Sequence, residues 1–364
     1  DVRHLGKYLR KSYNKYKNKL VEDFGDTIDD AILTKMAKDR LNDELRSGVQ
    51  TIQYQINTLM TTNGQAPFIT VFMYLNEVPE GQTKKDLAAI IEEMLYQRIQ
   101  GVKNEKGVYV TPAFPKLIYV LDEHNCLKGG KYDYLTKLAV QCSSKRLYPD
   151  YISAKIMREN YEGNVFSPMG CRSFLSPWKN EKGEYVFESR FNQGVVSINL
   201  PQIGIIANGD EEKFWKLFDQ RLQLCFDALM CRHNALLGTM SDASPIHWQY
   251  GAIARLEKGE PIDKLLNSYF STISLGYIGI YEVTKLMKGV SHTDPVGEEF
   301  SVRVMKHMRE TVNRWKEETG LGFALYGTPA ESLCYRFARV DKERFGDIED
   351  ITDKGYYTNS YHVD

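Results

Sequence analysis

One cysteine of this sequence stands in a setting that suits chemistry. Cys171 lies in the segment Ser167–Leu175, which is rich in turn-forming residues, and Arg172 follows it directly. A neighbouring positive charge favours the thiolate, and reactive cysteines are commonly found in such loops. The cysteines on expected helices fit the packing role of small buried hydrophobes instead; they are Cys142, Cys225, Cys231 and Cys334.

A second candidate precedes an apolar strand. The polar segment Ser189–Gly194 leads directly into the run GVVSINL, which predicts a buried strand over 194–200. Polar residues at this position are commonly turn formers. Asn192 is therefore a candidate functional residue whose alternative is a purely structural turn.

A third candidate is the segment from Leu321 to Ser332, which predicts a strand, a glycine and a helix start. Thr328 suits the N-cap, Pro329 the first helical position, and Glu331 completes a capping box. Free N–H groups at a helix start favour an anion, so a phosphate site is one interpretation. The other is a well-capped helix, since the Glu331 carboxylate would repel a phosphate unless it points away.

The elements that must position these segments alternate along the chain. The expected strands are 66–76, 115–121, 194–200, 271–275, 321–326 and 356–363. The expected helices are 84–100, 132–146, 210–237, 299–318 and 329–340. Strands separated by helices of this length imply parallel crossovers, which predicts an α/β fold. Functional sites in such folds collect where the strands end.

The N-terminal region predicts two helices before this alternation begins. The first, over about 1–20, has one basic face, and the second, over about 26–60, is expected to be interrupted near Gly48. A basic face of this kind is usually a solvated outer face, and nucleotide phosphate binding is the less common alternative.

The composition excludes several classes of protein. Of 364 residues, 42% are hydrophobic and 26% charged, and 47 basic against 48 acidic side chains give a net charge of −1. This balance argues against disorder and against bulk nucleic-acid binding. Apolar runs such as 117–121 are too short to cross a bilayer. No Cys-x-x-Cys, His-Glu-x-x-His, P-loop or dinucleotide motif occurs, which favours a reduced, cytoplasmic setting without a metal site in this chain.

Two further expectations concern organisation. No linker-like stretch divides the sequence, which predicts a single domain. The chain begins with Asp1 and no signal-like segment follows, so we expect a piece of a longer protein.

Long segments of this sequence closely resemble the catalytic subunit of anaerobic (class III) ribonucleoside-triphosphate reductases. Among them are GNVFSPMGCRSFLSPW (163–178), SRFNQGVVSINLPQI (189–203) and YGTPAES (326–332). The resemblance extends over essentially the whole chain. It implies a ten-stranded α/β barrel of two five-stranded halves, incomplete at both ends here. The single partial domain would span 1–364, with helices to about residue 60 and barrel elements from 61 onward.

The resemblance also implies site residues. Cys171 would become the thiyl radical that abstracts the ribose 3′ hydrogen, and Asn192 would hydrogen-bond the ribose hydroxyls as the 2′ oxygen leaves as water. The substrate phosphates would bind at Gly327, Thr328, Pro329, Ala330, Glu331 and Ser332. Asn63 and His362, at expected strand ends, are candidates for lining the cavity; a structural role is the commoner alternative.

The cofactors and partners implied by the resemblance lie largely outside this chain. They comprise a glycyl radical, a radical-SAM activase, formate as reductant and a zinc site. Ribonucleoside triphosphate substrates, nucleotide effectors and a homodimer are also implied, with neither nucleic acid nor membrane as a partner. The alternatives are a lyase of the same glycyl-radical architecture, and an inactive fragment that only binds nucleotide or dimerises.

Overall fold

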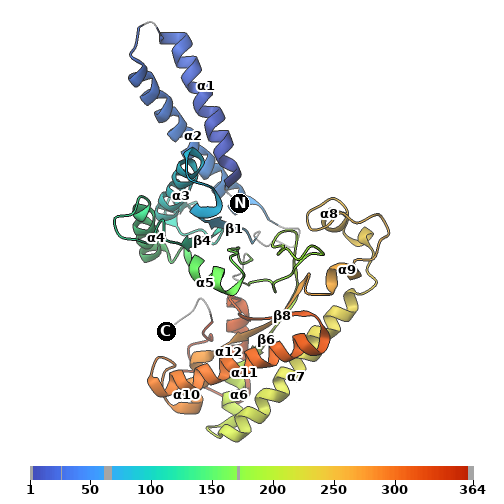
Figure 1. Cartoon of the computed structure of the whole chain (residues 1–364). Helices are drawn as coiled ribbons and strands as arrows, with labels where there is room; N and C mark the ends of the chain where they lie inside the picture. Colours follow the sequence, from blue (N-terminus) through green and yellow to red (C-terminus); the bar gives the residue numbers. More distant parts are fainter. Residues whose placement is uncertain (1–2, 26, 61–67, 170–172, 360–364) are drawn as a thin grey trace. The chain divides into compact units, whose positions relative to one another are not determined.

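The computed structural model describes residues 3–25, 27–60, 68–169 and 173–359. The chain forms two compact units, Asp1–Cys171 and Arg172–Asp364, which are described separately (Figure 1). Among the helices of the described ranges, none has the length and apolarity needed to cross a membrane.

The N-terminal unit contains a parallel three-stranded sheet in the order β1-β4-β5 and an antiparallel pair β2-β3. Its helices are α1 (Gly6–Phe24), α2 (Asp30–Thr58), α3 (Gln82–Gln100), α4 (Asp133–Arg146) and α5 (Ala154–Asn160), with 3-10 turns at Arg3–Leu5 and Leu75–Glu77. Its strands are β1 (Thr70–Met73), β2 (Val102–Lys103), β3 (Tyr109–Val110), β4 (Lys116–Leu121) and β5 (Asp150–Ser153).

Strand alternation divides the apolar residues of β1 between two cores. Val71 and Met73 pack with α3 and α4 on one face, whereas Phe72 packs with Ile118 on the other. Burial on both faces explains why this strand has a continuous apolar run in the sequence. The strand expected at 115–121 is confirmed as β4, whereas the strand expected at 66–76 is confirmed only over Thr70–Met73, because a 3-10 turn follows at Leu75–Glu77.

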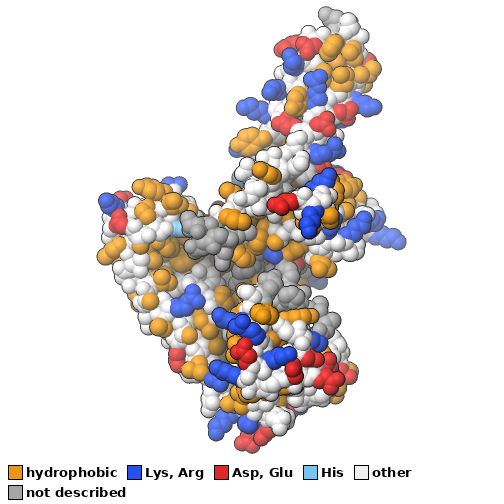
Figure 2. Space-filling view, turned by 180° about the vertical axis from the view of Figure 1, so that it is seen from behind, with side chains coloured by type: hydrophobic (Ala, Val, Ile, Leu, Met, Phe, Trp, Pro, Cys, Tyr) orange, Lys and Arg blue, Asp and Glu red, His pale blue; other side chains and the backbone are white. Residues whose placement is uncertain are grey.

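The two N-terminal helices α1 and α2 form a hairpin (Figure 1) around Leu20, Leu33 and Ala37. The expected basic face is partly neutralised, because Lys17 Nζ lies 2.7 Å from Asp30 of α2, and Figure 2 shows acidic and basic side chains intermixed over the hairpin. The interruption expected near Gly48 is wrong. One glycine costs only about 1 kcal/mol in a helix, and the apolar stripe of α2 continues through it into the core.

The C-terminal unit is a second parallel three-stranded sheet in the order β6-β7-β8 with its crossover helices. Its strands are β6 (Asn192–Asn199), β7 (Thr272–Ile278) and β8 (Gly322–Gly327). Its helices are α6 (Leu200–Ala207), α7 (Glu211–Leu236), α8 (Pro245–Trp248), α9 (Asp263–Leu266), α10 (Ile280–Lys288), α11 (Pro295–Thr319) and α12 (Glu331–Phe345), with a 3-10 turn at Ser241–Ala243.

The C-terminal sheet has one apolar face. Ile273, Leu275 and Phe323 are buried there in a core shared with Phe218 of α7 and Trp315 of α11. Figure 1 shows α7 and α11 lying along this sheet. Amphipathic helices cover this face because their packing buries the apolar stripe of each helix together with the apolar face of the sheet. The expected strands and helices of this unit are confirmed up to residue 345.

The described residues form a mixed α/β structure, as expected, but they contain eight strands in three open sheets and no closed ten-stranded barrel. The strand expected over 356–363 is wrong in its described part. Residues 357–359 do not form a strand, although Thr358 O accepts from the Gly279 N–H at 2.9 Å. Instead, Thr358 donates from its backbone N and Oγ1 to the buried Glu282 carboxylate at 2.8 and 2.7 Å. The Glu282 carboxylate therefore binds the N–H that a strand would use in a ladder.

Candidate active site

A polar face lies opposite the apolar core of the C-terminal sheet. The pairing aligns Ser197 with Gly276 and Tyr326, and Val195 with Ser274 and Ala324. Because side chains alternate along a strand, these residues share one face. On this face the Ser197 Oγ lies 2.7 Å from the Oγ1 of Thr328, which directly follows β8. Both hydroxyl groups lie next to Gly276.

A β-bulge brings Asn192 onto this polar face. The register shifts between Asn192 and Gly194, so that Asn192 pairs with Thr272 while Val195 pairs with Ser274. Residues three apart would point to opposite faces in a regular strand, and the extra residue of the bulge restores the same face. The half-buried Asn192 side chain donates from Nδ2 to Ser274 Oγ, and its Oδ1 accepts from the Gly194 N–H at 2.7 Å.

The loop after β8 has a different geometry from the expected capping box. The helix α12 begins at Glu331 with Ala330 as its N-cap, and no side chain caps it. Thr328, only 3% exposed, is drawn to Ser197 instead, and its N–H extends the β8 ladder to Tyr277 O at 3.2 Å. The capping box is therefore wrong. No side chain caps α12, and the N–H groups of Leu333 and Cys334 bond Ala330 O at 3.1 and 3.0 Å, so the uncapped start of the helix is a candidate anion site.

The remaining residues of this loop lie where a ligand can reach them. Pro329 and Ala330 are half-buried and Ser332 is exposed, and Gly327 ends β8. Together with Thr328 they follow the carboxyl end of a parallel strand, which is the edge where α/β proteins usually bind ligands.

The segment that follows the cysteine loop crosses the opposite end of the polar face. Ser176 donates from its backbone N to Thr272 Oγ1 at 2.8 Å and from its Oγ to Phe323 O at 3.1 Å. The Arg190 guanidinium holds this crossing, since it donates to the carbonyls of Ser176 and Tyr269 at 2.5 and 2.6 Å. Burial lowers the pKa of Arg190 to about 10, so it remains charged near neutral pH.

Three of the sequence candidates, Cys171, Asn63 and His362, lie outside the described residues. Of the other cysteines, Cys142, Cys225 and Cys334 are buried as expected. Burial raises the pKa of Cys142 and of Cys225 to about 11, which keeps both as thiols. Cys231 is exposed, contrary to expectation, because the buried positions of α7 recur at 218, 222, 225 and 229 and leave 231 on the outer side.

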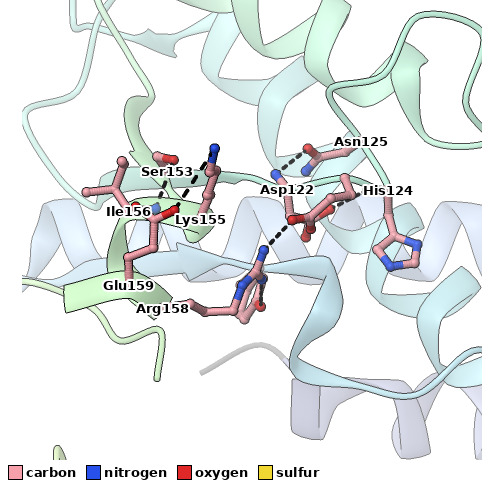
Figure 3. Close-up of polar contacts among 10 residues, drawn as sticks. Asp122, His124, Asn125, Ser153, Lys155, Ile156, Arg158 and Glu159 are labelled. Atoms are coloured by element: carbon pink, nitrogen blue, oxygen red, sulfur yellow. Dashed lines mark hydrogen bonds and ion pairs between the residues drawn. The ribbon is translucent and has the colours of Figure 1, made fainter. Parts of the chain in front are cut away.

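A polar cluster that the sequence did not indicate lies at the carboxyl edge of the N-terminal sheet (Figure 3). Arg158 of α5 contacts Glu123 Oε1 at 2.5 Å and Tyr74 Oη at 3.5 Å. Asp122 Oδ1 accepts from the His124 N–H at 2.7 Å. In the part of the chain that the structure describes, no group of three or more His, Cys, Asp or Glu side chains is placed to hold a metal ion. The contact of Arg158 with Glu123 links α5 to the segment that follows β4.

The glycine beneath the hydroxyl pair provides a test of the polar face. A Cβ at Gly276 would overlap Thr328 Oγ1 and Ser197 Oγ. We expect Gly276→Ala to break their hydrogen bond and to lower the free energy of unfolding by about 1–3 kcal/mol. The measurement is a thermal melt.

The matched control for that substitution is Gly48→Ala. Its Cβ would meet no atom within 4 Å, so a gain of about 0.5–1 kcal/mol in helix stability is expected. Wild-type stability in the Gly276 variant would show that the hydroxyl pair does not stabilise this sheet.

The fold and the site define an α/β protein whose parallel sheet buries one face under helices and presents polar side chains on the other. A family model for anaerobic ribonucleoside-triphosphate reductases matches residues 2–364. The Escherichia coli (strain K12) reductase is 40% identical over 372 aligned positions, covering 99% of this chain and 49% of that protein. The reductase of Enterobacteria phage T4 is 38% identical over 99% of this chain and 57% of its own length.

The chain therefore belongs to the anaerobic ribonucleoside-triphosphate reductase family, and it spans about half the length of the curated relatives it matches. Solved structures of the Thermotoga maritima anaerobic ribonucleotide reductase share its fold. The structure with glycerol in the active site has a TM-score of 0.60 at 18% identity, covering 89% of this chain and 51% of that one. The complex with dATP and CTP has a TM-score of 0.58 at 18% identity, covering 89% and 52%.

Proposed function

We propose that this chain forms the substrate-facing part of an enzyme that reduces ribonucleoside triphosphates to 2′-deoxyribonucleoside triphosphates. The observation that carries the proposal is the shared polar face, on which the bulge places Asn192 together with Thr328. Ser274, which Asn192 contacts, and Tyr277, which pairs with Gly327, are three residues apart. At the usual rise this is about 10 Å along the strand, a span of the same order as a ribose with its phosphates.

Asn192 has the groups that a ribose requires. One N–H of its amide is used by Ser274, and one lone pair of its Oδ1 is used by the Gly194 N–H. The amide retains a second N–H and a second lone pair, so it can donate to one hydroxyl and accept from its neighbour. We assign it to the 2′ and 3′ hydroxyls of the substrate.

The phosphates are assigned to the loop after β8. The uncapped start of α12 supplies N–H groups and a favourable dipole for an anion. Gly327, Thr328, Pro329, Ala330, Glu331 and Ser332 would form this subsite. The absence of a side-chain cap on α12 supports the assignment of the phosphates to this loop, because no side chain competes with an anion for the first N–H groups of the helix.

Cys171 is assigned the hydrogen abstraction. Ser176, five residues after Cys171 in the sequence, donates from its backbone N to Thr272, the strand partner of Asn192. A thiyl radical on Cys171 would take the 3′ hydrogen, which activates loss of the 2′ hydroxyl as water. The overall balance is ribonucleotide, formate and one proton giving deoxyribonucleotide, carbon dioxide and water.

The remaining assignments concern the whole enzyme. A glycyl radical, installed by a radical-SAM activase, would supply the unpaired electron, and formate the two reducing electrons. We also propose that the enzyme binds nucleotide effectors, forms a homodimer and has a zinc site outside this chain. This chain would form part of a single barrel domain. Asn63 and His362 are proposed to line the cavity.

Nucleotide binding and turnover can be tested together. The full-length enzyme, activated without oxygen, is expected to convert nucleoside triphosphates to deoxynucleotides with formate, and calorimetry is expected to show triphosphate binding that Gly276→Ala weakens. Binding without turnover would favour a role confined to nucleotide binding. Absence of both, with turnover of a small non-nucleotide substrate, would favour a lyase of the same architecture.

A further inference from the structure

The bulge that places Asn192 on the polar face is held by one end of α7. Gln193, the residue inserted at the bulge, extends a half-buried side chain away from Asn192 toward this helix. Its Oε1 lies 2.8 Å from Nδ1 of His233, a residue only 4% exposed. Arg232, the preceding residue of α7, donates from Nη1 to Val195 O at 3.1 Å. The end of the helix therefore contacts the bulge on both sides of Gly194.

The hydrogen bonds of Gln193 determine the proton on His233. The Gln193 amide nitrogen donates to Leu266 O and to Ser271 Oγ, both at 2.8 Å. A backbone carbonyl can only accept, so the Nε2 must face it and the Oε1 must face His233. Nδ1 of His233 is therefore the donor. Burial lowers the pKa of His233, which favours the neutral ring carrying its proton on Nδ1.

We propose that Gln193 and His233 are positioning residues, whose hydrogen bond maintains the bulge and thereby holds Asn192 on the polar face. The inference rests on the proposed function, since Asn192 is the group it positions. A slip of one residue would turn a strand side chain to the other face, which in this sheet is the apolar core. The Gly194 N–H, which binds Asn192 Oδ1, lies inside the same bulge, so loosening Gln193 also loosens the contact that orients the amide.

The test replaces the histidine in the full-length enzyme. His233→Leu removes the donor, and His233→Asn retains an N–H near the position of Nδ1. We expect His233→Leu to lower kcat at least about tenfold with nucleotide affinity within about twofold, and His233→Asn to restore kcat to within about threefold. Hydrogen exchange of the 192–195 amides should be faster in His233→Leu only.

A second variant and a control complete the design. Gln193→Met removes the bond to His233 together with those to Leu266 O and Ser271 Oγ, and it replaces His233→Leu if that variant shows no cooperative melt. Gln223→Ala removes only a surface hydrogen bond to Asp227 on α7 and should behave as the wild type. Wild-type kcat in both His233→Leu and Gln193→Met, or unchanged exchange at 192–195, overturns the proposal. If the wild type made no deoxynucleotide, the proposed function would fail, while the exchange comparison would still decide whether this bond holds the bulge.

Discussion

Replacing Cys171 with serine or alanine in the full-length enzyme is expected to abolish deoxynucleotide formation, by at least about 1,000-fold in kcat. An O–H bond is much stronger than an S–H bond, so serine cannot form the radical although it has nearly the same shape. Triphosphate affinity should remain within about threefold of wild type, because the proposed phosphate subsite at 327–332 does not include Cys171. Product formation is measured by chromatography and affinity by calorimetry.

The matched control for this prediction is Cys231→Ser. Cys231 is exposed on α7 and lies outside the polar face, so kcat should be unchanged. Turnover at the wild-type rate in a Cys171 variant would show that another group abstracts the hydrogen. Loss of activity in Cys231→Ser as well would indicate a general sensitivity of the enzyme to thiol removal.

The second large effect is expected for Asn192→Ala, with a decrease of about 100-fold in kcat, as for loss of a hydrogen bond to the reacting centre. The same change removes two hydrogen bonds, to Ser274 and Gly194, each contributing about 1 kcal/mol to stability. Steady-state kinetics, nucleotide affinity and a thermal melt therefore have to be measured on the same preparation.

Stability and chemistry are separated by two comparisons. Asn234→Ala, on the exposed side of α7, should leave both kcat and the melting temperature unchanged. If Asn192→Ala lowered the melting temperature but left kcat intact, Asn192 would be a structural turn residue, the alternative its sequence context allows. A decrease in affinity as large as that in kcat would assign it to binding in the ground state.

Several elements follow from the pattern of residues alone. The apolar runs of β4 and β6 and the periodic stripe of α7 predict those elements because burial on a strand or on one helix face requires that spacing. Elements without such a run are not predicted by this pattern. Strand β5 pairs in parallel with β4. Of its four residues only the two central ones, Tyr151 and Ile152, are apolar, which is too few to form a recognisable apolar run.

Local sequence predicts the wrong structure where a side chain bonds a distant residue instead of its neighbours. Thr328 has the sequence context of an N-cap, but a hydroxyl from β6 and the backbone of β7 compete for it, and the helix begins later. The run 356–363 suggests a strand. The buried Glu282 carboxylate, 76 positions earlier in the chain, instead binds Thr358.

The sequence by itself determined the family and the α/β class, and it selected Asn192 and the loop after β8 as candidates, because these depend on residue type and spacing within short segments. Only the tertiary structure decided that both lie on one face of one sheet. That outcome depends on the one-residue bulge at Gln193–Gly194, which reverses the side on which Asn192 emerges. A bulge is selected by partners such as His233, 40 residues away in the chain, and no local pattern records them.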